Sequence, residues 1–205
     1  GCNVSRHLYI INELIISFIY YIYLKYIHMK NSILSIAILI ITLISSTELT
    51  AQKFKSLDKS PMDATAFPNS YKISDKIVKV IYSRPQLNGR DLVKLAPPEK
   101  VWRTGANEAA EITFYKDVIF GGKALKAGTY SLFTIPSLEG DWTVIINRAR
   151  NIWGSYYYKQ DQDVIRVSGK TSKVEENIEA FSIMFEKDMT LKMGWGNTVI
   201  SVSIK

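Results

Sequence analysis

The stretch VIFGGKALKAGTYSLFTIP, residues 118 to 136, indicates the fold more clearly than any other part of the chain. Its apolar residues fall in short runs with alternating spacing, which is typical of strands that bury one face. Gly121-Gly122 interrupts these runs as a tight turn that needs positive φ, and Ala127-Gly128 forms a second turn. The stretch therefore predicts antiparallel strands joined by short connections.

The same pattern extends in both directions, from residue 73 to the end of the chain. Upstream, KIVKVIYS is the first clear strand, and a turn signal at Asn88-Gly89 precedes room for one helical turn at 91–95. The later strands share an alternation of apolar and polar residues, and they are expected at 141–148, 163–169, 172–176, 179–188, 190–195 and 197–205. The strand at 163–169 is expected to pair with 172–176, and Gly196-Asn197 is expected to make the last turn.

Many short antiparallel strands, each with one apolar face, have few ways to bury those faces. We expect an all-β, single-domain antiparallel β-sandwich over residues 73–205, with jelly-roll or Greek-key-like connections. A β-barrel is the second choice. Residues 52–72 are expected to form an N-terminal extended segment.

Residues 29–51 have the layout of a secretory signal peptide. A short basic start at Met29-Lys30 is followed by an apolar run at 33–44 and by SSTELTAQ, with cleavage expected after Ala51. Residues 1–28 are then an upstream extension, and the mature chain is secreted or periplasmic. The alternative is a membrane anchor formed by the apolar segments 8–24 and 33–44.

Histidine and cysteine occur only near the start of the chain, as Cys2, His7 and His28. A mature chain beginning at Gln52 would contain neither residue type. This excludes Ser-His-Asp and Cys-His nucleophiles, most zinc and copper sites and structural disulfides. Residues 161–163 lack the further ligands of a calcium loop, so neither a metal nor a cofactor is expected.

The 205-residue chain carries a formal net charge of +7. Three basic and two acidic residues precede Gln52, so the remainder carries +6. The basic residues are scattered, and a nucleic-acid partner is therefore not expected. No stable membrane insertion is expected after signal cleavage, and the sequence makes no prediction of oligomeric state.

Several motifs occur in a characteristic order: YSRP (82–85), NGR (88–90), VWRTGANEA (101–109), GKALKAGTYSLFTIP (122–136), WTVIINR (142–148), WGSYYY (153–158) and DVIRV (163–167). This series resembles the domain-of-unknown-function family 2911, secreted or envelope proteins of Gram-negative bacteria. The resemblance covers the chain from about residue 60 to its end. It implies export and the β-fold, and it carries no established activity.

A polar cluster in and around VWRTGANEA is the first candidate site, and it consists of Arg84, Arg90, Arg103, Asn107, Glu108 and Glu111. In the structural interpretation, Arg103 pairs with Glu108 or Glu111, and Trp102 plugs the end of the sandwich. In the functional interpretation, Trp102 is a stacking platform, Arg103 and Asn107 donate hydrogen bonds, and Glu108 accepts them. In both, Gly105 suits a turn in which the backbone closely approaches another segment.

The segment WGSYYYKQDQD is the second candidate, because Trp153, Tyr156, Tyr157 and Tyr158 fall within six residues of a polar loop. Both faces of an extended segment cannot be buried in one core, so some of these aromatics should be exposed for ligand binding. In the alternative, Tyr156 and Tyr158 pack on one side and only Tyr157 lies at the surface.

Together these features predict an exported envelope protein acting as a non-catalytic binding module for a glycan or another small polar ligand. One alternative is a carboxylate-dependent hydrolase of envelope polysaccharide that uses Glu108 with Glu111 or Asp163. If strand pairing begins by Glu108, however, Glu108 and Glu111 point to opposite faces. The other alternative is a structural or partner-binding domain.

Overall fold

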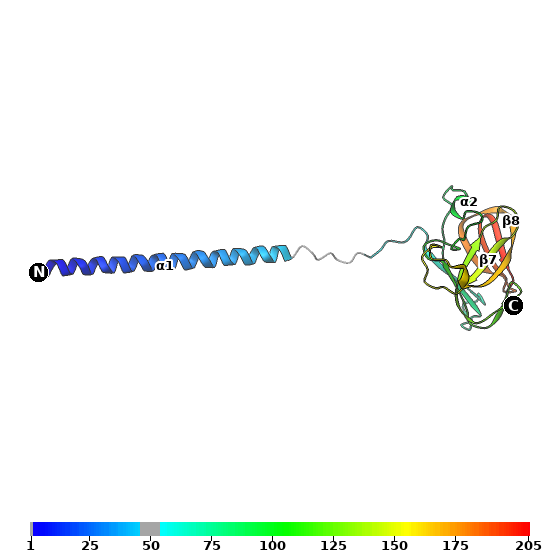
Figure 1. The fold of residues 1–205 in the computed structure, drawn as a ribbon, viewed down its shortest axis with the longest axis horizontal. Helices are drawn as coiled ribbons and strands as arrows, with labels where there is room; N and C mark the ends of the chain where they lie inside the picture. Colours follow the sequence, from blue (N-terminus) through cyan, green and yellow to red (C-terminus); the bar gives the residue numbers. More distant parts are fainter. Residues whose placement is uncertain (1, 46–53) are drawn as a thin grey trace. The chain divides into compact units, whose positions relative to one another are not determined.

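The structure, a computed structural model, describes residues 2–45 and 54–205. The chain forms two compact units, Gly1–Lys55 and Ser56–Lys205 (Figure 1). The first contains a single long helix and the second contains all of the β-strands. Each unit is described by itself.

The helix of the first unit, α1, spans Cys2–Ser45. It contains neither proline nor glycine and runs through Met29 without a break. Its section Glu13–Ile41 is long and apolar enough to cross a membrane, a property that a signal sequence near an N-terminus shares. An N-terminal apolar helix is therefore compatible with a signal sequence. The cleavage position expected after Ala51 lies outside the described residues.

The second unit is a seven-stranded antiparallel sheet in the order β1-β2-β3-β6-β7-β8-β9, with β4 and β5 as a separate hairpin. The strands are β1 Met62–Phe67, β2 Val78–Ser83, β3 Ala110–Phe114, β4 Val118–Phe120, β5 Lys123–Leu125, β6 Gly128–Ile135, β7 Trp142–Asn147, β8 Asp163–Phe185 and β9 Leu191–Val202. Apart from the β4–β5 hairpin, neighbours in the sheet follow one another in the chain. No Greek-key crossing occurs among the described strands.

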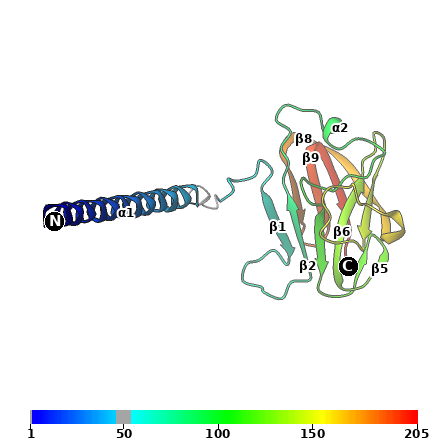
Figure 2. The same ribbon diagram turned by 60° about the vertical axis from the view of Figure 1, so that its left-hand side comes forward.

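The sheet curls into a half-barrel, so its two ends face each other across one core (Figure 2). The rings of Tyr82 on β2 and Phe181 on β8 meet edge to face at a centroid distance of 5.7 Å. The residues that follow β2 also pair with β8. The N–H of Phe181 donates to Pro85 O at 2.9 Å, and the N–H of Leu87 donates to Glu179 O at 3.0 Å. The predicted all-β antiparallel class is confirmed, and a single curled sheet supplies both walls of the core.

Two strands are longer than predicted. β8 is continuous through the strands expected at 163–169 and 172–176 and into the one expected at 179–188, where it ends at Phe185, so the first two do not pair with each other. β9 passes through Gly196-Asn197, where the expected turn is replaced by a positive φ of 57° at Gly196 inside the strand. The register of β8 against β9 shifts between Lys173 and Ile178 and again between Ile178 and Ser182, which marks bulges or irregularities in the pairing.

The short connections largely follow the prediction. The hairpin β4–β5 turns at Gly121 and Gly122, whose φ values are 53° and 84°. The single helical turn before the two prolines is α2, Leu92–Leu95. The strand β1 is an addition to the predicted set, because it lies within the segment 52–72 and forms one edge of the sheet.

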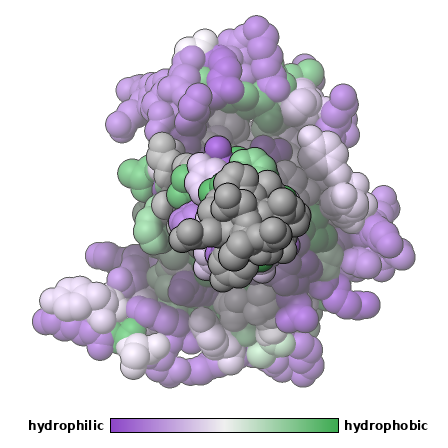
Figure 3. Space-filling model, turned by 90° about the vertical axis from the view of Figure 1, so that its left-hand side faces the viewer, coloured by the Kyte–Doolittle hydropathy of each residue, from purple (hydrophilic) through white to green (hydrophobic). Residues whose placement is uncertain are grey.

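The core lies inside the curl, and a second, smaller apolar cluster lies on the outside. The outer cluster comprises Ala109, Phe133 and Ile145, against which Val101, Ile135 and Tyr158 pack. It holds the segment after β7 against the outer face of the sheet, and a short 3₁₀ helix, η2 Gln160–Gln162, ends that segment. Elsewhere the face of the domain seen in Figure 3 is mostly hydrophilic, with hydrophobic residues in small separate groups.

Candidate functional site

Trp102 lies in the core rather than at a ligand-facing surface. Its backbone exchanges two hydrogen bonds with Thr134 of β6, at N···O distances of 2.7 and 3.0 Å. Its side chain is 5% exposed and stacks on Trp195 at a centroid distance of 5.4 Å, while Phe181 meets it edge-on. Trp102 thus closes the core, as the structural interpretation expects. The stacking role of the functional interpretation is not available to it.

Among the described residues, no carboxylate forms an ion pair with the positive charge of Arg103. It is partly buried, and its Nε is the one buried side-chain nitrogen or oxygen of the described residues without a hydrogen-bond partner. No ion pair in the described part of the chain includes Arg103, so the expected pair with Glu108 or Glu111 is not formed. Burial lowers the pKa of Arg103 and the electrostatic effect of Tyr156 raises it, but the guanidinium stays charged.

Left-handed backbone turns fold the VWRTGANEA motif back on itself. The N–H of Ala110 donates to Arg103 O at 3.0 Å, and Asn107 has a φ of 60°. Gly105 has a φ of 157°, and a Cβ there would lie 3.0 Å from Ser83 O on β2. Only glycine therefore fits this turn against β2. The close backbone approach predicted at Gly105 is confirmed, and the neighbour is Ser83.

The two candidate segments lie side by side. Glu108 forms an antiparallel bridge with Trp153. The N–H of Gly154 donates to Asn107 O at 2.9 Å, which continues this pairing by one residue. Residues that are more than 40 positions apart in the chain therefore form one short ribbon on the outside of the curled sheet.

Glu108 and Glu111 line one cleft of about 290 Å³. The strand β3 begins at Ala110, so Glu108 precedes the regular alternation of the strand and is not forced to the face opposite Glu111. One oxygen of the Glu111 carboxylate accepts the N–H of Asn151 at 2.8 Å. The remaining walls of the cleft, mostly apolar, come from Met62, Ile81, Tyr82, Ser83 and Ala109.

Three of the four aromatics of the second segment are exposed. Trp153 is 55% exposed, Tyr156 83% and Tyr157 70%. Tyr158 instead packs edge-to-face on Phe133 of the outer cluster, at a centroid distance of 5.1 Å. The expectation of exposed aromatics is confirmed, and the alternative in which Tyr156 packs beside Tyr158 is wrong.

Asp163 fastens the aromatic segment to the sheet. Its carboxylate is 9% exposed and accepts hydrogen bonds from Tyr158 Oη at 2.7 Å, Arg166 Nε at 2.6 Å and Asn147 Nδ2 at 2.7 Å. Burial, followed by the bond to Asp163, raises the pKa of Tyr158 to about 12. These contacts commit Asp163 and Tyr158 to structure, and Asp163 does not line the cleft that contains Glu108.

Arg84 and Arg90 lie elsewhere and serve the fold. Arg84 forms an ion pair with Asp63 at 3.2 Å and donates to Ser182 Oγ at 2.7 Å, which links β1 to β8 where the half-barrel closes. Arg90 donates to two backbone carbonyls of its own loop, at 2.9 and 2.8 Å. The structure therefore does not bring these two predicted site residues to Arg103.

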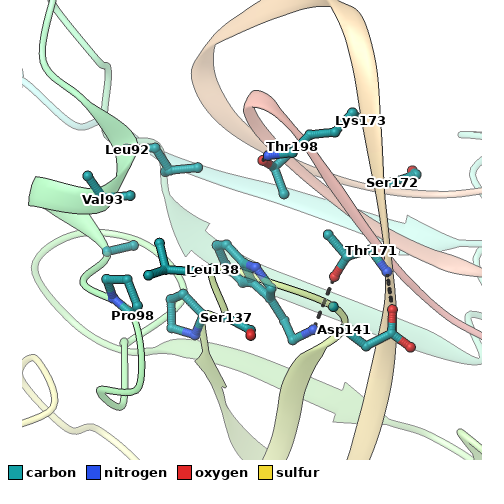
Figure 4. Close-up of a pocket in the computed structure, with 14 residues that line it drawn as sticks. Leu92, Val93, Pro98, Ser137, Leu138, Asp141, Thr171, Ser172, Lys173 and Thr198 are labelled. Carbon is teal, nitrogen blue, oxygen red and sulfur yellow. Dashed lines mark hydrogen bonds between the residues drawn. The ribbon is translucent and has the colours of Figure 1, made fainter.

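A second hollow, which we call the mouth pocket, was not indicated by any sequence motif. It has a volume of about 300 Å³ and lies where the start of β7 meets α2, β8 and β9 (Figure 4). Trp142, 5% exposed, contributes to it from the core. The pocket is assembled from separate segments, each of which supplies a few ordinary side chains, so the sequence contains no local signal for it.

Within residues 2–45 and 54–205, no group of three His, Cys, Asp or Glu side chains could hold a metal ion. Asp161 lies in η2, and the carboxylate of Asp163 is occupied by Tyr158 and Arg166. The chemistry of the described site therefore consists of carboxylates, a guanidinium and aromatic rings.

Comparison with known proteins places the whole sheet in one family. A family model described as a protein of unknown function (DUF2911) matches residues 61–204. These bounds enclose every strand from β1 to β9. No curated protein and no solved structure matches the chain. The chain therefore belongs to the DUF2911 family of proteins of unknown function.

Proposed function

We propose that the protein is exported and acts as a non-catalytic binding module for a glycan or another small polar ligand. The observation that carries the proposal is the bridge between Glu108 and Trp153. It brings an exposed aromatic ring beside a cleft that contains two carboxylates. Pockets that combine aromatic surface with a few convergent polar groups are typical of small-ligand sites.

Each group has a distinct role in this proposal. The exposed rings of Trp153 and Tyr156 cover the apolar C–H face of a sugar, which replaces the role first assigned to Trp102. Glu108 and Glu111 accept hydrogen bonds from hydroxyl groups in the cleft. Arg103 does not line the cleft, but Tyr156 acts on its charge and no ion pair of the described residues includes it. In this proposal its guanidinium donates to a hydroxyl or a carboxylate of a ligand held against the Tyr156 ring.

A hydrolase is the second candidate, because Glu108 and Glu111 line the same cleft. Glycoside hydrolysis commonly uses a pair of carboxyl groups on the two sides of the bond that breaks. Against it, Glu111 is already tied to the backbone of Asn151. Asp163, the other predicted partner, is held by three hydrogen bonds in a different place. We therefore favour binding over hydrolysis.

Export is supported by the apolar section of α1, Glu13–Ile41. In this proposal, residues 29–51 act as the signal peptide and residues 1–28 are an upstream extension. N-terminal sequencing of the protein isolated from its natural cells tests the assignment, with Gln52 as the expected first residue. A chain that retains residues before Met29 would instead support the membrane anchor formed by the segments 8–24 and 33–44.

The binding proposal is tested through Trp153, because Trp102, Trp142 and Trp195 are all at most 5% exposed. Iodide quenches exposed tryptophan, so a bound oligosaccharide should protect the emission of Trp153 from iodide. A panel of neutral and carboxylated oligosaccharides is titrated while quenching is followed. Protection by a member of the panel, lost in Glu108→Gln and in Arg103→Met, supports the proposal. Tyr115→Ala is the control, since Tyr115 is also exposed but lies outside both segments.

The hydrolase alternative makes a different prediction for the same panel. Release of reducing ends that stops in Glu108→Gln, at an unchanged melting temperature, would replace binding by catalysis. Protection of Trp153 without any release of reducing ends favours the binding module. If neither response occurs with any member, the proposed ligand class is wrong.

A further inference from the structure

We propose that the mouth pocket is a second binding site, and that its ligand is a small molecule with an apolar body and one carboxylate group. The site is separate from the cleft of Glu108 and Glu111, with which it shares no lining residue. Mouths of barrel-like sheets are common places for ligand pockets.

One wall of the pocket is apolar. Figure 4 shows Leu92, Val93, Pro98 and Leu138 on the same side of the hollow. Val93 is 49% exposed and Leu138 is 74% exposed, so these side chains lie at the rim and are not enclosed in the core. Apolar side chains that gather at a concave site are suited to cover the apolar part of a ligand.

The opposite wall is polar and comes from β8 and β9. Thr171, Lys173 and Thr198 lie on this side in Figure 4. Lys173 Nζ donates to Thr198 Oγ1 at 2.9 Å, and no carboxylate in the described part of the chain forms an ion pair with it. An ammonium group has three donors, so Lys173 keeps donors for a ligand.

Asp141 is the carboxylate among the described residues that line the pocket, and both of its oxygens already accept hydrogen bonds. Asp141 accepts the N–H of Thr171 at 2.8 Å and the hydroxyl of Ser168, also at 2.8 Å. The hydrogen bond from Thr171, followed by that from Ser168, lowers the pKa of Asp141. Asp141 stays negatively charged, but each of its two oxygens already accepts a hydrogen bond from the protein. Lys173 is the charged group of the pocket that keeps free donors, and this favours a negatively charged ligand group on the polar side.

The volume of about 300 Å³ limits the ligand to a small body, about the size of a fused pair of aromatic rings. A further hollow of about 600 Å³ adjoins the pocket and shares Leu92, Val93, Lys173 and Thr198 with it. Lys173 thus stands where the two hollows meet. A ligand whose carboxylate binds Lys173 would have its apolar body against Leu138 and Trp142.

The proposal is tested with 2-naphthoate and 2-naphthamide, which share the same rings but differ in charge. The purified full chain is titrated with each compound by calorimetry. We expect naphthoate to bind more tightly than naphthamide by roughly tenfold, the usual contribution of one charge-assisted hydrogen bond. Lys173→Met should remove this difference and leave naphthamide unchanged. Lys187→Met is the control, because Lys187 is exposed in the turn after β8 and does not line the pocket.

A second variant tests the apolar wall. Leu138→Ala should weaken both compounds several-fold without unfolding the protein, because Leu138 is 74% exposed. Trp153→Ala should leave both affinities unchanged, which separates this site from the proposed glycan site. If naphthoate does not bind, or if Lys173→Met leaves its advantage over naphthamide intact, the proposal is wrong.

Discussion

Trp102 and Trp153 belong to neighbouring segments, yet their side chains differ sharply in solvent exposure. Trp102 is 5% exposed and stacks on Trp195, whereas Trp153 is 55% exposed beside Glu108. Trp102 and Glu108 are six positions apart in the chain. The left-handed turns between them direct the backbone away from the core. Residue type therefore does not tell which aromatic stabilises the fold and which can meet a ligand. The position of each ring relative to the curled sheet does.

Among the variants that test this comparison, the largest change in stability is expected from replacing Trp102. We expect Trp102→Ala to lower the free energy of unfolding by about 3–5 kcal/mol, because it leaves a cavity among packed aromatic rings. Trp153→Ala should lower it by less than about 0.5 kcal/mol, since the ring is mostly in water. Urea unfolding of the two variants measures both values. Equal losses would contradict the division into inner and outer aromatics.

Tyr158 belongs to the same segment as the exposed Trp153, but it is the one aromatic of that segment that packs against the sheet. Tyr158→Phe removes its hydrogen bond to Asp163 and should cost about 1 kcal/mol of unfolding free energy. Tyr157→Phe, a change at an exposed ring, is the control and should cost nothing measurable.

The cost of Tyr158→Phe should also depend on pH. The pKa of Tyr158 is raised from 10.0 to about 12 in the folded state, so the folded chain holds this proton more tightly than the unfolded chain. The contribution to stability is complete below pH 10 and is lost as the pH rises to about 12. The difference between the two proteins should therefore shrink in this window. A constant difference across it would show that the hydroxyl titrates normally.

Arg103 should have a much smaller effect on stability. Because no carboxylate in the described part of the chain pairs with its guanidinium, Arg103→Met removes a partly buried cation without leaving an anion unpaired. We expect a change within about 0.5 kcal/mol in either direction by urea unfolding. A loss above about 2 kcal/mol would instead match the buried ion pair that the sequence suggested.

The smallest expected effect is spectroscopic. Trp153→Phe should remove most of the iodide-quenchable tryptophan emission while leaving the unfolding curve unchanged, because the other three tryptophans are enclosed. Stern–Volmer plots of the two proteins provide the measurement. Substantial quenching in the variant would mean that the aromatic core is open to solvent.

The class of fold could be predicted because the alternation of apolar residues is a local property of each strand. The Gly121-Gly122 hairpin was predictable for the same reason. The lengths of β8 and β9 were not. Gly196-Asn197 has the composition of a turn, but Asn197 Nδ2 donates to Val174 O and Glu175 O of the neighbouring strand and the chain continues. Only the partner strand decides between a turn and an irregularity within a strand.

The candidate site shows the same limit. The exposure of Trp153 and Tyr156 could be predicted from the density of aromatics in one loop. The shared cleft of Glu108 and Glu111 could not, because it depends on β3 beginning at Ala110. The mouth pocket left no trace in the sequence, since distant segments each contribute a few side chains to it.

Strand β8 contributes a residue that anchors one candidate site and a residue that lines the other. Asp163, at its first residue, anchors the aromatic segment, and Lys173, ten positions along the same strand, lines the mouth pocket. If the strand transmits strain between them, thermodynamic reciprocity requires each occupant to change the affinity of the other by the same factor. Titrating the ligand of one site while the other site is saturated would give that coupling factor. A factor of one would mean that the two sites bind their ligands independently.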